Sequence, residues 1–157
     1  MAIFMFDIDK FKSINDRFGH PGGDKVIKLL ATTAKKTLRQ TDVFGRLGGE
    51  EFAAFLGNTD EKGAVIVAER VRLAFKEAAK VVDGTAIGAT VSIGVTFTTN
   101  YQDQVDGLLG RADEALYEAK NSGRNRVMVR SEHNAQVAAA SIVPDLSEAL
   151  AESVTTH

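Results

Sequence analysis

The sequence predicts an α+β domain of order β-α-β-β-α-β, whose helices pack on one face of a mostly antiparallel sheet. Two observations predict this class. Short apolar runs, several of them rich in β-branched or aromatic residues, alternate with longer stretches whose apolar residues recur at helical spacing. The chain has 157 residues, 44% of them hydrophobic and 25% charged, which suits one globular domain with one core.

The first elements are expected to be a buried strand and two helices. Residues 2–8 form an apolar run that ends in acids, as in a core strand whose C-terminal end opens on a site. Residues 9–18 predict a short helix, and the glycines and proline of residues 19–23 predict a break after it. Asp24 is placed to cap the next helix. The apolar stripe of that helix is Val26, Ile27, Leu29, Leu30, Ala34 and Leu38.

A hairpin and a second long helix are expected next. Residues 43–47 and 52–56 have the composition of strands, and Gly48 and Gly49 between them are typical of a tight turn. Residues 62–80 predict a helix with one apolar face, formed by Val65, Ala68, Val71 and Phe75.

The last elements complete the domain, which is expected to span residues 1–130. Residues 89–97 predict a strand, residues 105–121 a helix that ends at a Ser-Gly pair, and residues 126–129 a short strand. Residues 131–157 are rich in Ala, Ser, Glu and Thr and predict a tail that is either flexible or contains a short docked helix.

Composition excludes several classes of function. The net charge of -2 argues against binding to a nucleic-acid polymer, which usually requires a basic surface. The absence of cysteine excludes disulfides, thiolate metal sites and cysteine nucleophiles, and it is compatible with a cytoplasmic location. No apolar run approaches the roughly 20 residues that span a bilayer, so no membrane segment is predicted.

Two acids, Asp7 and Asp9, flank Ile8 at the end of the first strand. Alternate side chains of a strand point the same way, so both carboxylates are expected on one face of the sheet. Acids are rare at the end of an apolar strand unless they are paired or bind a metal. Capping of the following helix is the favoured interpretation for Asp9, and metal binding is favoured for Asp7.

Two further acids, Glu50 and Glu51, follow the glycines of the predicted hairpin. An acidic, solvated turn is the ordinary interpretation of such a pair. If the two strands are neighbours, however, Glu51 and Asp7 meet, and two carboxylates suit Mg²⁺ together with water and substrate phosphates. Such ions position a hydroxyl and a phosphate for in-line displacement, which favours nucleotidyl transfer. No Gly-x-Ser-x-Gly and no Walker-type loop is present.

Five further polar residues are candidates for nucleotide binding. Lys12, Lys120 and Arg124 are candidates for phosphate contacts, although most surface cations are simply solvated. Asn15 and Asp24 suit a purine edge, because Asn both donates and accepts and Asp accepts from N–H groups. Their alternatives are a polar helix end and a helix cap.

Several spaced motifs together resemble one family, the GGDEF-domain diguanylate cyclases, in the GGEEF variant. The opening motif is FDIDKFKSIND, followed by FGH and GD; the signature is RLGGEEF; the closing motifs are ADEALYEAK and GRN. The resemblance covers residues 2–130 and depends on several motifs in order. Family members usually carry a further helix and a DxLT-type segment before the first strand, which this chain lacks.

The resemblance implies a palm-like, ferredoxin-like fold and an enzyme that condenses two GTP into cyclic di-GMP and two pyrophosphates. It implies that Asp7, Glu51 and the Ile8 carbonyl bind Mg²⁺ or Mn²⁺. It implies that Glu50 handles the attacking 3′-hydroxyl. Each domain holds one GTP, so a homodimer is expected for catalysis.

The resemblance also implies the substrate contacts. Guanine is bound by Asn15 and Asp24. The residues that contact the GTP phosphates or lie close to them are Lys12, Lys120, Arg124, the backbone near Phe11, and the turn glycines Gly48 and Gly49.

Arg39-Gln40-Thr41-Asp42 resembles the RxxD inhibitory site of the same family, in which Arg39 and Asp42 bind the product cyclic di-GMP. The alternative is an arginine at a helix C-terminus followed by an acid in a turn. Two other functions stay open: a domain that binds cyclic di-GMP without catalysis, and a regulatory domain that binds GTP without turnover.

Overall fold

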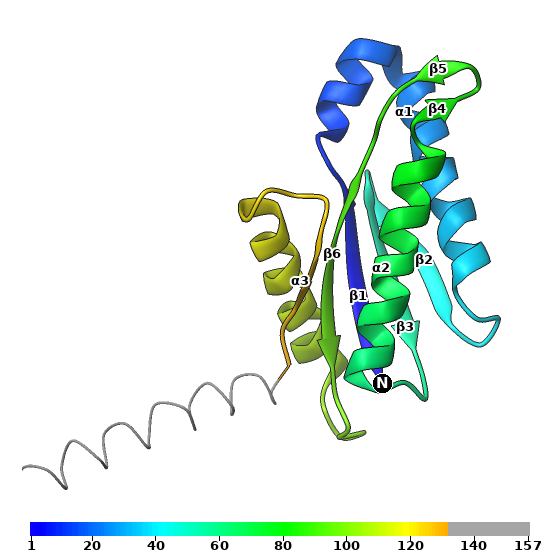
Figure 1. Cartoon of the computed structure of the whole chain (residues 1–157). Coiled ribbons are helices and arrows are strands. Elements are labelled where there is room, and N and C mark those ends of the chain that lie inside the picture. The colour runs from blue at the N-terminus through cyan, green and yellow to red at the C-terminus, as the bar shows by residue number, and fades with distance from the viewer. Residues whose placement is uncertain (132–157) are drawn as a thin grey trace, which may run out of the picture.

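The computed structural model describes residues 1–131, which form a central sheet with helices on both sides (Figure 1). Its elements in chain order are β1 Ala2–Ile8, α1 Phe11–Thr37, β2 Val43–Gly48, β3 Glu51–Leu56, α2 Glu61–Ala78, β4 Val81–Val82, β5 Thr85–Ala86, β6 Val91–Phe97, α3 Val105–Asn121 and β7 Val127–Val129. The predicted α+β class and the order of the main elements are confirmed. The expected features of residues 132–157 lie outside the described residues.

The five-stranded sheet has the order β2-β3-β1-β6-β7. Strand β1 lies at its centre and pairs antiparallel with both β3 and β6, while β7 pairs parallel with β6. The central position explains why every residue of β1 is buried and why its sequence is a continuous apolar run. The C-terminal end of β1 therefore opens between two neighbouring strands.

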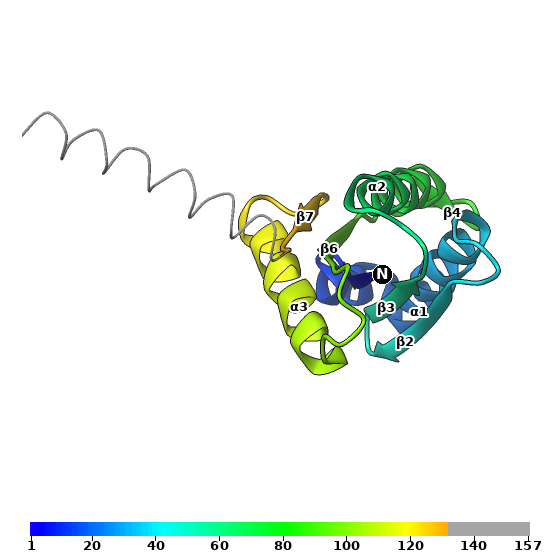
Figure 2. The same cartoon turned by 90° about the horizontal axis from the view of Figure 1, so that it is seen from below.

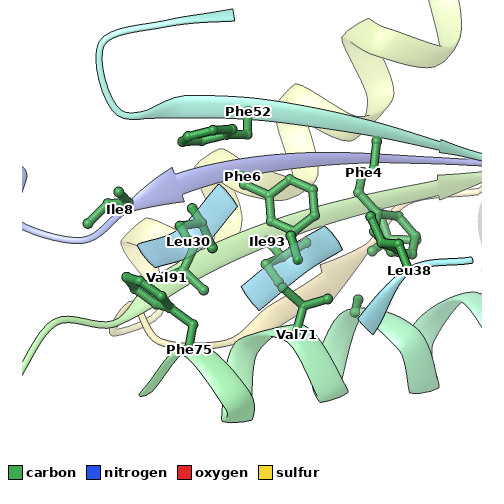
Figure 3. Packing of buried hydrophobic residues seen from close by; sticks show 14 of the residues in the cluster. Phe4, Phe6, Ile8, Leu30, Leu38, Phe52, Val71, Phe75, Val91 and Ile93 are labelled. Atoms are coloured by element: carbon green, nitrogen blue, oxygen red, sulfur yellow. The ribbon is translucent and has the colours of Figure 1, made fainter. Parts of the chain in front are cut away.

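The two faces of the sheet are covered by different helices (Figure 2). Even-numbered residues of β1 pack with α1 and α2 in the larger core, which Figure 3 shows around Phe6, Leu30 and Val71. Odd-numbered residues of β1 pack with α3 in a second, smaller core that includes Ile3 and Leu116. The prediction that the helices share one face is wrong. A helical stripe shows that a side is buried, but not against which face of a sheet it packs.

Contacts between aromatic rings stabilise the larger core. The ring of Phe6 meets Phe4 and Phe44 edge-on at 6.0 and 5.7 Å, and Phe44 stacks on Phe52 at 5.3 Å. These pairs join β1, β2 and β3 next to the turn between β2 and β3, which carries the GGEEF signature and is called the signature turn. Each fully buried phenylalanine contributes about 1.5–3 kcal/mol from burial alone.

Helix α1 consists of two helical stretches that meet at a kink, and the kink lies inside the predicted break over residues 19–23. Only Gly19, with φ 73° and ψ 170°, leaves helical geometry, and the helix resumes through Pro21. Proline is tolerated there because its missing N–H falls in the first turn of the resumed helix. Asp24 lies inside this helix, so its predicted role as a cap is wrong. The N-cap of α1 is Lys10, with no side-chain cap, so the predicted capping by Asp9 is also wrong.

A small hairpin of β4 and β5 was not predicted. Its turn is Asp83-Gly84, with φ of 47° and 80°, which is the Asp-Gly pair that favours two-residue hairpin turns. The two strands have two residues each, too few to show an alternating pattern.

Helix α3 approaches β6 closely at Gly94. A Cβ at this position would lie 2.1 Å from the carbonyl oxygen of Ala112 and 2.3 Å from the backbone nitrogen of Leu116. Only glycine permits this contact, which sets the height of α3 over the sheet and brings Lys120 to the end of β1. Among the helices of residues 1–131, none combines the length and apolar character needed to cross a bilayer.

Candidate metal and nucleotide site

Asp7 and Glu51 are directly opposed on neighbouring strands. The register of the β1–β3 ladder pairs Asp7 with Glu51, at the end of β1 and the start of β3. Asp7 is only 4% exposed, whereas Glu51 faces solvent. The two strands are therefore neighbours, which was the condition for the two predicted metal ligands to meet. Cross-strand partners of this kind lie about 5 Å apart at Cβ, which is suitable for two carboxylates that share one cation.

Asp7 forms an ion pair with the last-turn lysine of α3. The Nζ of Lys120 lies 2.7 Å from Oδ2 of Asp7. Burial nevertheless raises the pKa of Asp7 above the ordinary aspartate value, the Lys120 ammonium opposes that rise, and the charges of Glu50 and Glu51 add to it. Three carboxylates are thus close enough to affect one another, and the site favours additional positive charge.

The donor set fits a hard divalent ion that also takes ligands from substrate. Within residues 1–131 no three His, Asp or Glu side chains converge in a ready-made metal cluster. Asp7 and Glu51 supply two carboxylates, and the carbonyl of Ile8 lies at the same strand end. Mg²⁺ is typically held by one or two carboxylates and completes its octahedron with water and phosphate oxygens.

The signature turn is tied to the rest of the site by backbone contacts. Gly49 and Glu50 form a two-residue turn between Gly48, the last residue of β2, and Glu51. The backbone N–H of Ile8 donates to the carbonyl of Glu50 at 3.3 Å. Arg46 Nε donates to the carbonyl of Gly49 at 2.8 Å and closes the turn. The predicted tight hairpin is confirmed, with Gly49 and Glu50 at its turn in place of the predicted Gly48 and Gly49.

The N-terminus of α1 lies beside these acids. Phe11 and Lys12 are its first residues, and no side chain caps the amides of its first turn. Amides at such a position favour an anion. A cavity of about 330 Å³ adjoins this turn, and its charged lining residues are the cations Lys10, Arg17 and Arg124 together with the carboxylate of Asp9. The N-terminus of α1 and the cations around it therefore suit a polyanionic ligand.

Asn15 carries an acceptor that has no partner. Its Oδ1 is buried and makes no hydrogen bond. The side chain fills the space where Gly23 lacks a Cβ, because a methyl group there would lie 1.8 Å from Oδ1. The kink at Gly19 thus folds the second part of α1 back against Asn15. Asp24 follows Gly23 directly and is exposed.

Arg39 and Asp42 form a compact turn after α1. The backbone N–H of Arg39 donates to Oδ2 of Asp42 at 2.8 Å, and the N–H of Asp42 donates back to the Arg39 carbonyl at 3.0 Å. The turn precedes β2, a strand of six residues that ends at Gly48. About 20 Å of extended chain therefore separates this turn from the signature turn.

Four residues with polar contacts at the site had no correct assignment from sequence. Asp9 accepts hydrogen bonds from Thr90, Ser92 and the backbone N–H of Asn125. Ser92 stands opposite Asp7 in the β1–β6 ladder. Ser92 is one of two polar residues, with Thr96, in a strand that is otherwise apolar, and this is the signal for it in the sequence.

Comparisons with known proteins agree with this geometry. The family model "Diguanylate cyclase, GGDEF domain" matches residues 1–126. The chain is 44% identical over 127 residues to diguanylate cyclase A of Treponema denticola, and 43% identical over 127 residues to the uncharacterized protein YhcK of Bacillus subtilis. These matches cover 81% and 80% of this chain but 34% and 35% of the relatives, so the chain spans about a third of their length.

Solved structures resemble the same part of the chain. The active GGEEF domain of a diguanylate cyclase from Vibrio cholerae is 35% identical with a TM-score of 0.75, covering 82% of this chain and 81% of that one. The GGDEF domain of DgcB from Caulobacter crescentus, solved with c-di-GMP, is 30% identical with a TM-score of 0.75, covering 82% and 76%. From its motifs, its fold and these matches, the chain belongs to the GGDEF family of diguanylate cyclase domains.

Proposed function

We propose that this chain is a diguanylate cyclase domain that condenses two GTP into cyclic di-GMP and releases two pyrophosphates. The observation that carries the proposal is the opposition of Asp7 and Glu51 at the end of β1, with Lys120 across from them. In each half-reaction the 3′-oxygen of one GTP forms a bond to the α-phosphorus of the other. The bond from that phosphorus to pyrophosphate breaks, and the hydroxyl proton is lost.

In this proposal Asp7, Glu51 and the Ile8 carbonyl hold Mg²⁺ or Mn²⁺, which stabilises charge on the phosphates and lowers the pKa of the attacking hydroxyl. Glu50 lies in the turn next to Glu51 and accepts a hydrogen bond from that hydroxyl. Support for a cation at this position comes from the raised pKa of Asp7, because burial and two neighbouring acids disfavour its negative charge.

The same proposal assigns the rest of the nucleotide. Lys12, Lys120, Arg124 and the first amides of α1 bind the phosphates. Lys120 is long enough to exchange its carboxylate partner for a phosphate oxygen. Asn15 and Asp24 bind guanine, and the unpartnered Oδ1 of Asn15 supports this, because a guanine N–H would satisfy it.

Two domains are required for turnover in this account, since each holds one GTP and the two nucleotides must face each other. The exposed position of Glu51 and of the signature turn is compatible with such an approach. We expect the reaction to occur in the cytoplasm, where GTP is supplied.

Product control is a further part of the proposal. Arg39 and Asp42 would bind cyclic di-GMP at the far end of β2. The preformed turn between them supports this, because the Arg39 backbone already orients the Asp42 carboxylate and leaves the guanidinium exposed.

The test is to measure GTP binding and product formation side by side. The purified chain is incubated at high concentration with GTP and Mg²⁺, and cyclic di-GMP is detected by mass spectrometry, with Glu51→Ala as the control. Product in the wild type alone supports the cyclase. Binding of GTP with no product would instead favour a regulatory domain, and binding of cyclic di-GMP alone would favour a receptor.

A further inference from the structure

Asp9 follows the proposed metal ligands Asp7 and Ile8 in the chain and is a carboxylate that is only 6% exposed. Its Oδ2 accepts from Thr90 Oγ1 at 2.8 Å and from the backbone N–H of Asn125 at 2.9 Å, and its Oδ1 accepts from Ser92 Oγ at 2.6 Å. A buried carboxylate is costly unless it is hydrogen-bonded, and three donors here meet that need. The donors come from the start of β6 and from the loop between α3 and β7, so Asp9 joins both to the end of β1.

The loop that Asp9 holds has an unusual backbone. Arg124 and Asn125 have φ of 62° and 46°, so two consecutive non-glycine residues adopt the left-handed conformation. Such residues are costly in isolation and persist where the surrounding structure restrains them. The hydrogen bond from the Asn125 N–H to Asp9 is one such restraint.

A second restraint acts on the same residue from helix α2. Arg72 Nη1 donates to Asn125 Oδ1 at 2.9 Å, and Arg72 is itself paired with Glu69 at 2.6 Å. Asn125 is thus held through its backbone by Asp9 and through its side chain by Arg72. Arg124, the residue before it, is exposed and lines the same cavity as Lys10 and Asp9.

We propose that Asp9 is a positioning residue, which restrains the left-handed Arg124–Asn125 segment so that the Arg124 guanidinium faces the phosphates of bound GTP. The inference rests on the proposed function, specifically on the phosphate role of Arg124. Asp9 itself touches neither substrate nor metal in this account, and it acts through the backbone of Asn125.

The alternative is a merely structural Asp9, and the two predict different ligand dependence. A positioning role affects only the phosphate-dependent part of affinity, so GTP is affected and guanosine is not. Purely structural damage lowers stability and affects both ligands or neither. A GTP analogue with a methylene group between the α and β phosphorus avoids turnover, because it cannot release pyrophosphate.

The experiment measures the affinity of this analogue and of guanosine by calorimetry. We expect Arg124→Ala to lower the affinity for the analogue by about tenfold or more, as for loss of a charge-assisted hydrogen bond, and to leave the affinity for guanosine unchanged. Asp9→Ala is expected to lower the affinity for the analogue by about three- to tenfold and to leave the affinity for guanosine unchanged. The double variant is expected to match Arg124→Ala alone, because the two residues act in series.

Asp9→Asn is the matched conservative variant. Its oxygen accepts from Asn125 and Thr90 while its NH₂ donates to the Ser92 hydroxyl, so it is expected to restore affinity for the analogue. If Asp9→Ala does not fold, Asp9→Ser provides a second test. Serine keeps one small polar group at this position, but its single oxygen is too close to the backbone to replace both carboxylate oxygens, so the restraint on Asn125 is lost. Asp9→Ser is expected to give the same loss of affinity for the analogue alone.

Three results overturn the proposal. The first is wild-type affinity for the analogue in Asp9→Ala or in Asp9→Ser, and the second is an equal loss of affinity for guanosine. The third is a double variant, Asp9→Ala with Arg124→Ala, whose loss of binding free energy for the analogue equals the sum of the two single losses. Wild-type affinity for the analogue in Arg124→Ala would remove the phosphate role of Arg124, and with it the reason for placing Asp9. That failure is distinct from a failed cyclase assay, which concerns turnover rather than phosphate binding.

Discussion

The Nζ of Lys120 lies 2.7 Å from Oδ2 of Asp7, and this contact joins the end of α3 to the end of the central strand. Asp7 is buried and has Glu50 and Glu51 as acidic neighbours, so one lysine does not hold its pKa at the ordinary value. The balance of burial, like charges and one ammonium gives this end of the sheet its affinity for cations.

The first prediction concerns pH. The folded chain binds the Asp7 proton more tightly than the unfolded chain, because the pKa of Asp7 is raised in the fold. Without metal, the contribution of Asp7 to the free energy of unfolding therefore falls as pH rises through the window between the ordinary and the raised pKa. We expect Asp7→Asn to be more stable than wild type at neutral pH in chelator, and this advantage to disappear in acid.

Thermal unfolding between about pH 4 and pH 8 checks this, with and without Mg²⁺. Mg²⁺ is expected to stabilise the wild type by about 2.7 kcal/mol at a hundredfold excess over its dissociation constant, and to leave Asp7→Asn unchanged. Equal stabilisation of both proteins by Mg²⁺ would contradict the assignment of Asp7 as a ligand.

The second prediction concerns Glu51. Glu51→Gln keeps the size of the side chain but removes the charge of a proposed metal ligand, so we expect turnover to fall by more than about a hundredfold. The fold should be retained because Glu51 is exposed. The measurement is the initial rate of cyclic di-GMP formation, with the exposed Glu77→Gln as a control that keeps full activity. Near-normal turnover in Glu51→Gln would remove the metal assignment.

The third prediction concerns Gly23. Alanine there places a methyl group 1.8 Å from Oδ1 of Asn15, so the amide must move. We expect Gly23→Ala to weaken GTP and guanosine alike, by about tenfold, because the base contact is lost and the phosphate contacts remain. This pattern differs from the one expected for Asp9→Ala, which lowers the affinity for the phosphate-bearing ligand alone.

The matched control is Gly107→Ala in α3, where a new methyl group meets nothing within 4 Å. This variant should bind both ligands as the wild type does. Unchanged guanosine affinity in a folded Gly23→Ala would show that Asn15 does not bind the base.

The fourth prediction concerns the turn before β2. Arg39→Ala removes an exposed guanidinium but keeps the backbone N–H that holds Asp42. We expect affinity for cyclic di-GMP to fall by about tenfold or more, and product inhibition to weaken by the same factor. Calorimetry with cyclic di-GMP checks this, and Lys36→Ala, also exposed, controls for the loss of one positive charge. Unchanged product affinity in Arg39→Ala would leave no basis for an inhibitory site.

Much of the fold was predictable because its elements have clear periods. The apolar run of β1 and the stripes of α1 and α2 indicated buried surfaces, and the structure confirms them except that Leu29 and Val65 are only partly buried while Ala64 is buried. The placement of α3 on the opposite face was not predictable, since it depends on which residues of β1 alternate toward it. The Asp83-Gly84 pair is a dipeptide that favours two-residue hairpin turns, but the strands beside it are too short to show a period.

The candidate site was predictable in part for a similar reason. The acids at the end of β1 and in the signature turn stand out against apolar neighbours, and the sheet order then brings Asp7 opposite Glu51. The role of Asp9 was not predictable, because its donors lie 81 to 116 positions away in the chain. Such contacts follow from the tertiary arrangement and leave no local pattern.

The most direct test of the central claim is the rate of cyclic di-GMP formation by the purified chain, measured by mass spectrometry at saturating GTP and Mg²⁺ over a series of protein concentrations. The account predicts cyclic di-GMP and pyrophosphate in a ratio of one to two. It also predicts a rate that rises with the square of the protein concentration while the domains are mostly separate, and a rate lower by more than about a hundredfold for Glu51→Gln. GTP that binds but is not converted at any protein concentration would contradict the account.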